Sequence, residues 1–434
     1  MTPRRGAPLG GRDGVRRVPG DQSSILRRGG EGPPLRIWIE RPEGCGPSQP
    51  QRSNGSTVRP SGARFRRVSA TPQILADPAP APGELLVVGF DGFEADSTLL
   101  DFLVRESIGG VILFRRNVRD AAQVARLTRA LREAAPGLLI GIDEEGGRVR
   151  RLSSDFTTFP SMDLLGKIGS DDLARELGGA IARELRAAGV NWDFAPVLDV
   201  HSNPANPIIG SRAISSDPAV VARLGVAFID GLQAGGVAGC GKHFPGHGDT
   251  SLDSHVALPV VNASRELLEE RELVPFRAAA RGSLASVMTA HVRYPALDAE
   301  RTATLSPAIL GDLLRRDLGF EGVVVTDDLE MRAVADHASP EELAVASIEA
   351  GADVMLACKS RDVQDRVLAG MRSALESGRI AAARLAASVA RVRNLRARFP
   401  IEAAEIDPDR ARTEAGSSRA LVARIEQRAQ RMLV

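Results

Sequence analysis

Residues 236–255 read GVAGCGKHFPGHGDTSLDSH. The first five are small or apolar, as in a buried strand, whereas the next fifteen hold three of the six histidines of the chain, two aspartates and a lysine. Three glycines and a proline interrupt this polar part, which predicts a strand that ends in an irregular loop. A single histidine there would be an ordinary solvated side chain. The whole cluster instead favours a catalytic loop.

The same pattern, an apolar run followed by polar residues, recurs along the chain from residue 84 onward. Eight runs alternate with segments of helical period, and they cover residues 85–90, 111–114, 138–143, 190–197, 237–243, 285–291, 322–327 and 352–357. One helical segment repeats leucine or isoleucine every fourth residue over 173–185, and Asp217 with Pro218 predicts the N-cap and first residue of another helix. This alternation predicts a parallel α/β fold, either a (β/α)8 barrel or a doubly wound sheet.

Polar side chains at the strand ends favour the barrel. They follow five strands, as Asp143, then Asp199 and His201, then Lys242 and His243, then His291, then Asp327 and Asp328. A barrel gathers all its strand ends around one mouth, whereas a doubly wound sheet has its site at one switch point. We therefore expect a TIM-type barrel as a single catalytic domain with extra C-terminal helices.

Composition divides the chain into three parts. Residues 1–80 are rich in Arg, Gly, Pro and Ser and have no sustained apolar period, which predicts a disordered extension. A nucleic-acid-binding tail or a transit peptide is less favoured, because Gly and Pro would interrupt an amphipathic helix. The barrel is expected over 84–400. Its last part, 361–398, predicts two helices, one closing the barrel and one packing outside it. Residues 401–434 predict a helical tail with a final surface helix.

Charge and cysteine usage limit the partners and the compartment. Residues 1–70 hold 14 arginines and 5 acidic residues, whereas the remainder holds 42 basic and 50 acidic residues, so its body is mildly acidic and disfavours nucleic acid. Cys45, Cys240 and Cys358 lie far apart without CxxC spacing, which predicts free thiols in a reducing compartment. No apolar run has the length of a membrane span or secretory signal. We expect a cytoplasmic monomer without a membrane partner.

The stretch VVVTDDLEM, residues 323–331, is a second chemical landmark. Asp327 ends the strand and should point into the mouth, where an unpaired carboxylate is costly unless it is paired or functional. Asp328 is either an N-cap of the next helix or a site residue. A carboxylate opposite a proton donor on another loop is the arrangement that glycoside hydrolysis needs.

A proton donor is available in the polar loop. Asp253 and His255 stand two residues apart, so in an extended loop they lie on the same side, where the carboxylate can hold one ring nitrogen and leave the other to move a proton. Lys242 places a positive charge beside the histidines, and no HxH or HExxH spacing is present. We therefore expect no metal ion and no cofactor.

The stretch GIDEEGGRVRRL, residues 141–152, supplies further polar groups. Asp143 ends the third strand, and alternation places at least one of the following arginines on the mouth side, to pair with an acid or bind a sugar hydroxyl. Arg212, in the GSR stretch after the fourth strand, is a weaker candidate for the same role.

In order and spacing, these motifs resemble glycoside hydrolase family 3, and within it the single-domain bacterial β-N-acetylglucosaminidases of peptidoglycan recycling. The resemblance covers about residues 84–400 and rests on IDEEGGRVRRL, NWDFAPVLDV, GSRAISSDP, GKHFPGHGDTSLDSH, VMTAHVRYP and GFEGVVVTDDLEM.

The resemblance implies a role for each matching position. Asp327 matches the nucleophile that forms a covalent glycosyl-enzyme with retention of configuration, His255 matches the acid/base, and Asp253 matches its orienting partner. The positions that match the N-acetylglucosamine-binding residues are Asp143, Arg151, Arg212, Lys242 and His243. Three more motif residues, His247, Asp249 and His291, are assigned only to site architecture.

The first hypothesis is thus a retaining exo-β-N-acetylglucosaminidase (a β-N-acetylhexosaminidase) that acts on muropeptides in the cytoplasm. A phosphorylase on the same scaffold is the nearest alternative, because a histidine tolerates incoming phosphate better than a glutamate does. A β-glucosidase fits the DSH loop less well. A sugar-binding protein without catalysis is disfavoured because Asp327, Asp253 and His255 are all present.

Overall fold

The computed structural model describes residues 79–252, 254 and 257–432. The predicted extension over residues 1–80 lies outside the described residues except for its last two positions, so its disorder stays a prediction. Asp253 and His255 also lie outside them.

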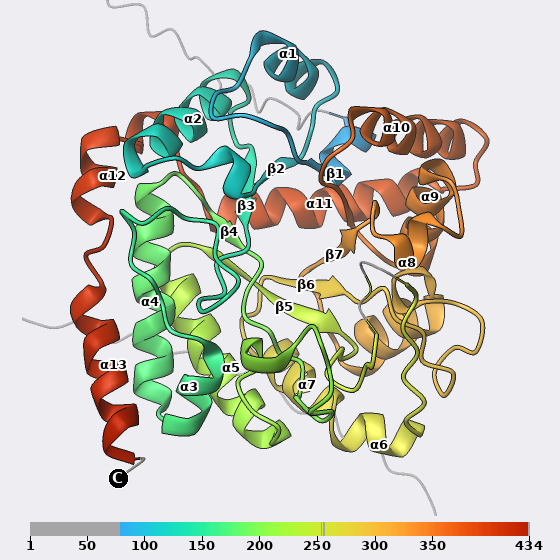
Figure 1. The fold of residues 1–434 in the computed structure, drawn as a ribbon. Helices are drawn as coiled ribbons and strands as arrows, with labels where there is room; N and C mark the ends of the chain where they lie inside the picture. The colour runs from blue at the N-terminus through green and yellow to red at the C-terminus, as the bar shows by residue number, and fades with distance from the viewer. Residues whose placement is uncertain (1–78, 253, 255–256, 433–434) are drawn as a thin grey trace, which may run out of the picture. The chain divides into compact units, whose positions relative to one another are not determined.

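Eight parallel strands in the described part of the chain close into a barrel, with β8 paired to β1 (Figure 1). The strands are β1 (Leu86–Val88), β2 (Gly110–Leu113), β3 (Leu139–Ile142), β4 (Trp192–Asp193), β5 (Ala238–Phe244), β6 (Ser286–Thr289), β7 (Val323–Asp328) and β8 (Val354–Ala357). Each overlaps one of the eight predicted runs. The predicted (β/α)8 fold is therefore confirmed.

Helices surround the barrel and connect its strands (Figure 1). They are α1 (Ser97–Arg105), α2 (Ala121–Ala134), α3 (Met162–Ile168), α4 (Asp171–Ala187), α5 (Pro218–Ala234), α6 (Arg265–Glu270), α7 (Leu273–Arg281), α8 (Arg332–Ala335), α9 (Pro340–Ala350), α10 (Arg361–Glu376), α11 (Ala382–Arg398), α12 (Pro408–Glu414) and α13 (Arg419–Met432). Short 3-10 helices are η1 (Pro82–Leu85), η2 (Arg115–Asn117), η3 (Gly210–Arg212), η4 (Ala303–Leu305) and η6 (Ala403–Glu405), and η5 (Ala308–Asp317) is a π-helix. The predicted start of α5 is confirmed, since the Asp217 carboxylate accepts a hydrogen bond from the Ala219 N–H.

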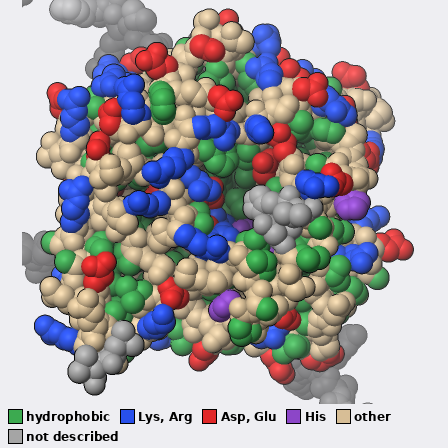
Figure 2. Space-filling model, in the orientation of Figure 1, with side chains coloured by type: hydrophobic (Ala, Val, Ile, Leu, Met, Phe, Trp, Pro, Cys, Tyr) green, Lys and Arg blue, Asp and Glu red, His purple; other side chains and the backbone are tan. Residues whose placement is uncertain are grey.

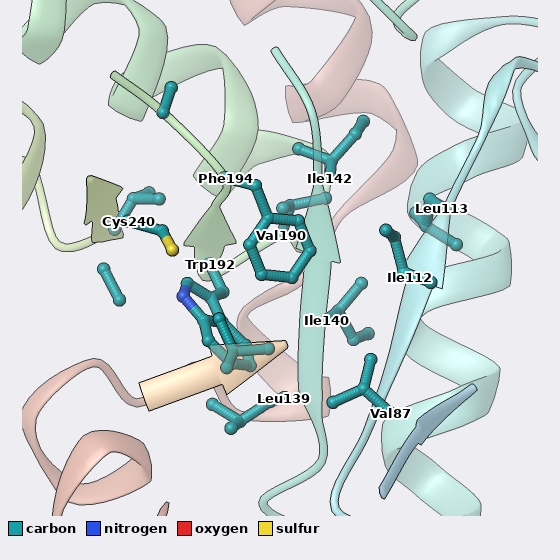
Figure 3. Packing of buried hydrophobic residues seen from close by; sticks show 14 of the residues in the cluster. Val87, Ile112, Leu113, Leu139, Ile140, Ile142, Val190, Trp192, Phe194 and Cys240 are labelled. Carbon is teal, nitrogen blue, oxygen red and sulfur yellow. The ribbon is translucent and has the colours of Figure 1, made fainter. Parts of the chain in front are cut away.

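Large side chains fill the barrel interior, as Figure 3 shows around β4. Trp192 and Phe194 pack with ring centroids 4.9 Å apart, and the Trp192 indole N–H donates to the Ser286 hydroxyl at 2.8 Å. Gly141 on β3 makes room for the Phe194 ring, because a Cβ at that position would lie 2.8 Å from a ring carbon. The barrel is thus a solid core that fixes the positions of the strand ends above it.

Helix α11 lies across the N-terminal ends of the strands, which we call the floor of the barrel. Its Arg393 binds Glu84, just before β1, at 2.8 Å, and its Arg391 binds Asp353, just before β8, at 3.1 Å. The sequence predicted only that this helix packs outside the barrel. The tail after it holds two separate helices, α12 and then α13 as the last helix of the described chain.

None of the helices in the described ranges is long and apolar enough to cross a bilayer.

Candidate active site

A cavity of about 200 Å³ opens at the C-terminal ends of the strands, which we call the mouth of the barrel. In Figure 2 it is the hollow near the centre of the molecule. The residues that line it are Ile112, Phe114, Asp143, Glu145, Val149, Arg151, Ile208, Arg212, Lys242, His243, His247, Ser254, Met288, Asp327, Asp328, Met331, Leu356 and Cys358. All five predicted sugar-binding residues and Asp327 are among them. Ser254, which stands between Asp253 and His255, is as well.

Asp327 is the carboxylate at the end of β7. One of its oxygens accepts a hydrogen bond from the Asp328 N–H at 2.8 Å. Burial acts to raise its pKa, but the neighbouring His243 and His291 and this N–H outweigh burial and bring the pKa below the ordinary value. Asp327 is therefore ionised at neutral pH, as a nucleophile must be.

Asp328 has the opposite character. Its Oδ1 atom accepts hydrogen bonds from the N–H groups of Glu330 and Cys358, at 3.1 and 3.2 Å, which ties the end of β7 to the end of β8. Burial, with the charges of Glu330 and Asp327, raises its pKa to about 7. The helix that follows begins only at Arg332, after Met331 as N-cap, so Asp328 is not a helix cap. Two adjacent carboxyls thus have pKa values pushed apart.

Lys242 is the centre of a buried ion-pair network on β5. Only 2% of its side chain is exposed, and its Nζ lies 2.7 Å from both Asp143 and Glu145. Burial alone would lower its pKa, but these two carboxylates raise it above the ordinary value, so the amine stays charged. Arg212 binds both oxygens of Glu145 at 2.8 Å, and Arg151 reaches Asp143 at 3.3 Å.

Asp199 holds the next two polar residues of the loop. Its Oδ2 lies 2.7 Å from His243 Nδ1, and its Oδ1 accepts the N–H groups of His243 and His247. Burial and the neighbouring His243 lower the pKa of His247 to about 4, and its ring bonds to the hydroxyls of Thr250 and Ser254. His247 is therefore a neutral residue that shapes the loop.

His291 and Asp249, which the sequence assigned only to site architecture, both have contacts with other parts of the chain. His291 Nε2 donates to the Asp328 carbonyl at 3.0 Å, its Nδ1 bonds to the Thr304 hydroxyl, and burial lowers its pKa. It thereby fixes the backbone beside Asp327. Asp249 is outside the cavity lining and binds Arg271 at 2.7 Å, which anchors the loop to the segment before α7.

Comparison with known proteins shows the family of the chain. The profile of the glycosyl hydrolase family 3 N terminal domain matches residues 82–395. The chain belongs to glycosyl hydrolase family 3. A beta-hexosaminidase of Thiobacillus denitrificans is 46% identical over 270 residues, which cover 60% of this chain and 74% of that protein. Beta-hexosaminidase A of Pseudoalteromonas piscicida is 38% identical over 336 residues, or 71% of this chain, but the match spans just over half (56%) of that relative.

Solved structures of family 3 enzymes have the same fold. A β-N-acetylglucosaminidase from Paenibacillus sp. str. FPU-7 superposes with a TM-score of 0.74 at 41% identity, over 80% of this chain and 68% of that one. NagZ from Neisseria gonorrhoeae, in complex with N-trifluoroacetyl-D-glucosamine, superposes with a TM-score of 0.61 at 35% identity, over 73% of this chain and 98% of that one. The predicted family is confirmed, and the chain is a glycoside hydrolase of the β-N-acetylhexosaminidase type.

Two residues of this family 3 site were not assigned from the sequence. Glu145 is 1% exposed and joins Lys242 to Arg212, and a signal for it existed, since it stands two residues after Asp143 and so on the same side of an extended segment. Asp199 was noted only as a polar strand end. Its bonds to His243 and His247 reach 44 and 48 residues along the chain, which no local pattern shows.

Proposed function

We propose that the protein is a retaining exo-β-N-acetylglucosaminidase that removes non-reducing terminal N-acetylglucosamine from muropeptides and peptidoglycan fragments. The observation that carries the proposal is Asp327, an ionised carboxylate at the end of β7 that lines a small polar cavity. Its neighbour Asp328 is bound to the backbone instead, so one carboxylate of the pair is available to a substrate.

The proposed reaction has two steps. In the first, an Asp327 oxygen attacks the anomeric carbon, the bond to the leaving oxygen breaks, and His255 donates a proton to that oxygen while Asp253 orients the imidazole. In the second, His255 takes a proton from a water molecule, which attacks the same carbon and releases Asp327. Two inversions give net retention. The roles of Asp253 and His255 are proposed from the sequence. They are supported by Ser254, which stands between them and lines the cavity.

The sugar-binding part of the proposal rests on the ion-pair network. Lys242, Arg212 and Arg151 offer donors to hydroxyl and acetamido oxygens, and Asp143 offers an acceptor. Because Lys242 and Glu145 are almost fully buried, the network is held in place before a sugar enters, which reduces the entropy lost on binding. The cavity of about 200 Å³ is smaller than the roughly 300–1,000 Å³ of common ligand sites, which suits one terminal sugar.

The substrate and compartment are proposed together. Free, buried Cys240 and Cys358 suit a reducing cytoplasm, where muropeptides from cell-wall turnover would be the source of N-acetylglucosaminides.

The test is turnover of a 4-nitrophenyl N-acetyl-β-D-glucosaminide by the full chain, with and without inorganic phosphate. Free N-acetylglucosamine whose first-formed anomer is β by NMR is the expected product. A sugar phosphate would show phosphorolysis instead, and an α anomer would exclude retention. With a fluorinated analogue that slows the second step, mass spectrometry should find the sugar on the peptide that contains Asp327. A sugar on any other peptide would refute the nucleophile assignment.

A further inference from the structure

The chain that follows β3 leaves the cavity at Asp143 and returns to it at Arg151, and both residues line it. Between them the chain turns back on itself, because the Glu145 N–H donates to the Val149 carbonyl at 3.0 Å. We call residues 143–152 the β3 loop. Its geometry decides where Arg151 lies relative to Asp143.

Glu144 stands between two residues of the cavity lining but is not one of them. Asp143 and Glu145 both line the cavity, whereas Glu144 is only 1% exposed and lies outside the lining. Side chains along an extended segment alternate between two sides, which accounts for this difference. A residue in this position cannot contact a sugar, so any effect that it has on the site must pass through a neighbour.

The Glu144 side chain joins the two ends of the β3 loop. Its Oε2 atom accepts hydrogen bonds from the Arg151 N–H at 2.8 Å and from the Leu152 N–H at 3.1 Å. Its own N–H donates to Oδ1 of Asp193, on β4, at 3.0 Å. The start of the loop is therefore fixed to the barrel, and the returning chain is fixed to the start through the carboxylate.

The Arg151 guanidinium has few contacts of its own. It reaches Asp143 at 3.3 Å, and its Nε atom has no hydrogen-bond partner among the described residues. Arg212 differs, because it binds both oxygens of Glu145 at 2.8 Å. The position of the Arg151 side chain therefore depends on its backbone, and Glu144 holds that backbone.

We propose that Glu144 is a positioning residue for sugar binding: by holding the backbone of Arg151, it keeps the guanidinium beside Asp143, where the two meet the terminal sugar. This inference rests on the proposed function, because it assumes that the sugar occupies the cavity. Since Glu144 touches neither the sugar nor the reacting atoms, its loss should weaken binding and leave the bond-breaking steps nearly unchanged. A carboxylate that only stabilises the fold would not affect binding.

The experiment measures kcat and KM of the full chain on the 4-nitrophenyl glycoside, and the Kd of N-acetylglucosamine by calorimetry. In Glu144→Met, which has a side chain of similar length but no carboxylate, KM and Kd should both rise about tenfold, with kcat within about twofold of native. Glu144→Gln should restore KM and Kd to within about threefold of native, because one amide oxygen can accept both N–H groups, as Oε2 does.

A double-mutant cycle tests whether Glu144 acts through Arg151. Arg151→Ala should raise KM by itself, and adding Glu144→Met should raise it no further, because the side chain that Glu144 positions is gone. Effects of the two substitutions that multiply would overturn the proposal. If Glu144→Met does not fold, Glu144→Asp takes its place in the cycle, since its carboxylate is one methylene short of the two N–H groups.

Glu184→Met is the matched control. Glu184, on α4, is 0% exposed and also accepts backbone N–H groups, from Thr157, Gly416 and Ser418, but it does not line the cavity. This variant should melt at a lower temperature with KM unchanged. An equal rise of KM in the two methionine variants would show that Glu144 is only structural.

The native chain separates failure of the positioning role from failure of the proposed function. If it turns over the glycoside and Glu144→Met has a native KM, only the positioning role is wrong. If it binds N-acetylglucosamine without turning over the glycoside, the proposed function fails, and the Kd values of the variants decide the role of Glu144. A native chain that does neither overturns both.

Discussion

The two ends of the barrel use the same residue types for different purposes. At the floor, Asp353 is 0% exposed, and its carboxylate accepts hydrogen bonds from Arg315, Arg384, Arg391, Ser388 and the Val324 N–H. At the mouth, Asp327 accepts one hydrogen bond among the described residues, from the N–H of its neighbour Asp328.

The difference shows how a buried acid is recognised as structural or functional. A carboxylate whose acceptor positions are all filled by the protein contributes to folding, and a ligand has no access to it. A carboxylate held ionised by nearby charges, with few bonds and a cavity in front of it, retains acceptor capacity for a substrate. The carboxylate at the floor thus stabilises the barrel, whereas the carboxylate at the mouth keeps acceptor positions that a ligand can use.

Asp327→Ala should have the largest effect of all. If Asp327 is the nucleophile, kcat should fall by about four orders of magnitude or more, because no covalent intermediate forms. The melting temperature should change little, since the side chain has few partners in the described chain. Calorimetry and turnover of the 4-nitrophenyl glycoside check both parts. A near-native rate would mean that the mouth carboxylate is structural after all.

His255→Ala should cost the next largest amount, about 10²- to 10⁴-fold, on a disaccharide whose leaving group needs a proton. Pre-steady-state glycosylation by an activated aryl glycoside should lose much less, because a phenolate leaves without help. Asp253→Asn should show the same pattern more weakly, as the imidazole is less well held. Equal losses on both substrates would make His255 a binding residue.

Asp353→Ala, at the floor, should lower stability and leave activity unchanged. Removing the buried carboxylate leaves the half-buried Arg315, Arg384 and Arg391 close together without their shared partner, so we expect a loss of about 3 kcal/mol in the free energy of unfolding. Urea denaturation measures this loss. The kcat of the folded fraction should stay native. A large fall in kcat at unchanged stability would mean that floor and mouth are coupled.

Asp328→Asn should have the smallest effect. Activity should stay far above that of Asp327→Ala, because the asparagine oxygen can still accept from Glu330 and Cys358. A reversed ranking of the two variants would move the nucleophile to Asp328.

Asp328→Asn should also change how the free energy of unfolding depends on pH. Folding raises the pKa of Asp328 to about 7, so the stability gained from its protonated form is complete below the unfolded value of about 4 and is lost as pH rises through 7. Between pH 5 and 8 the variant should therefore gain about 1–2 kcal/mol relative to the native chain, after allowance for screening at this partly exposed site. Glu144, which titrates in the same range, is present in both proteins and cancels. A constant difference across this range would contradict the shift.

The sequence by itself determined the barrel and the side of it on which the site lies. Apolar runs alternating with helical segments leave few topologies, and a polar residue directly after a strand must lie at the strand's C-terminal end. That rule placed Asp143, Lys242 and Asp327 at one mouth, because the end of a strand is a local feature that a short stretch of sequence shows.

Only the tertiary structure decided which of these charges are already paired. Lys242 meets Asp143 and Glu145 across 99 and 97 residues of chain, and α11 meets Glu84 across 309. Periodicity shows which way a side chain points, but it does not show which residue from elsewhere in the chain lies beside it. The pKa of an ionisable side chain depends on that neighbour. For this reason the sequence could name Asp327 and Asp328 together, and only the fold could tell the available carboxylate from the bound one.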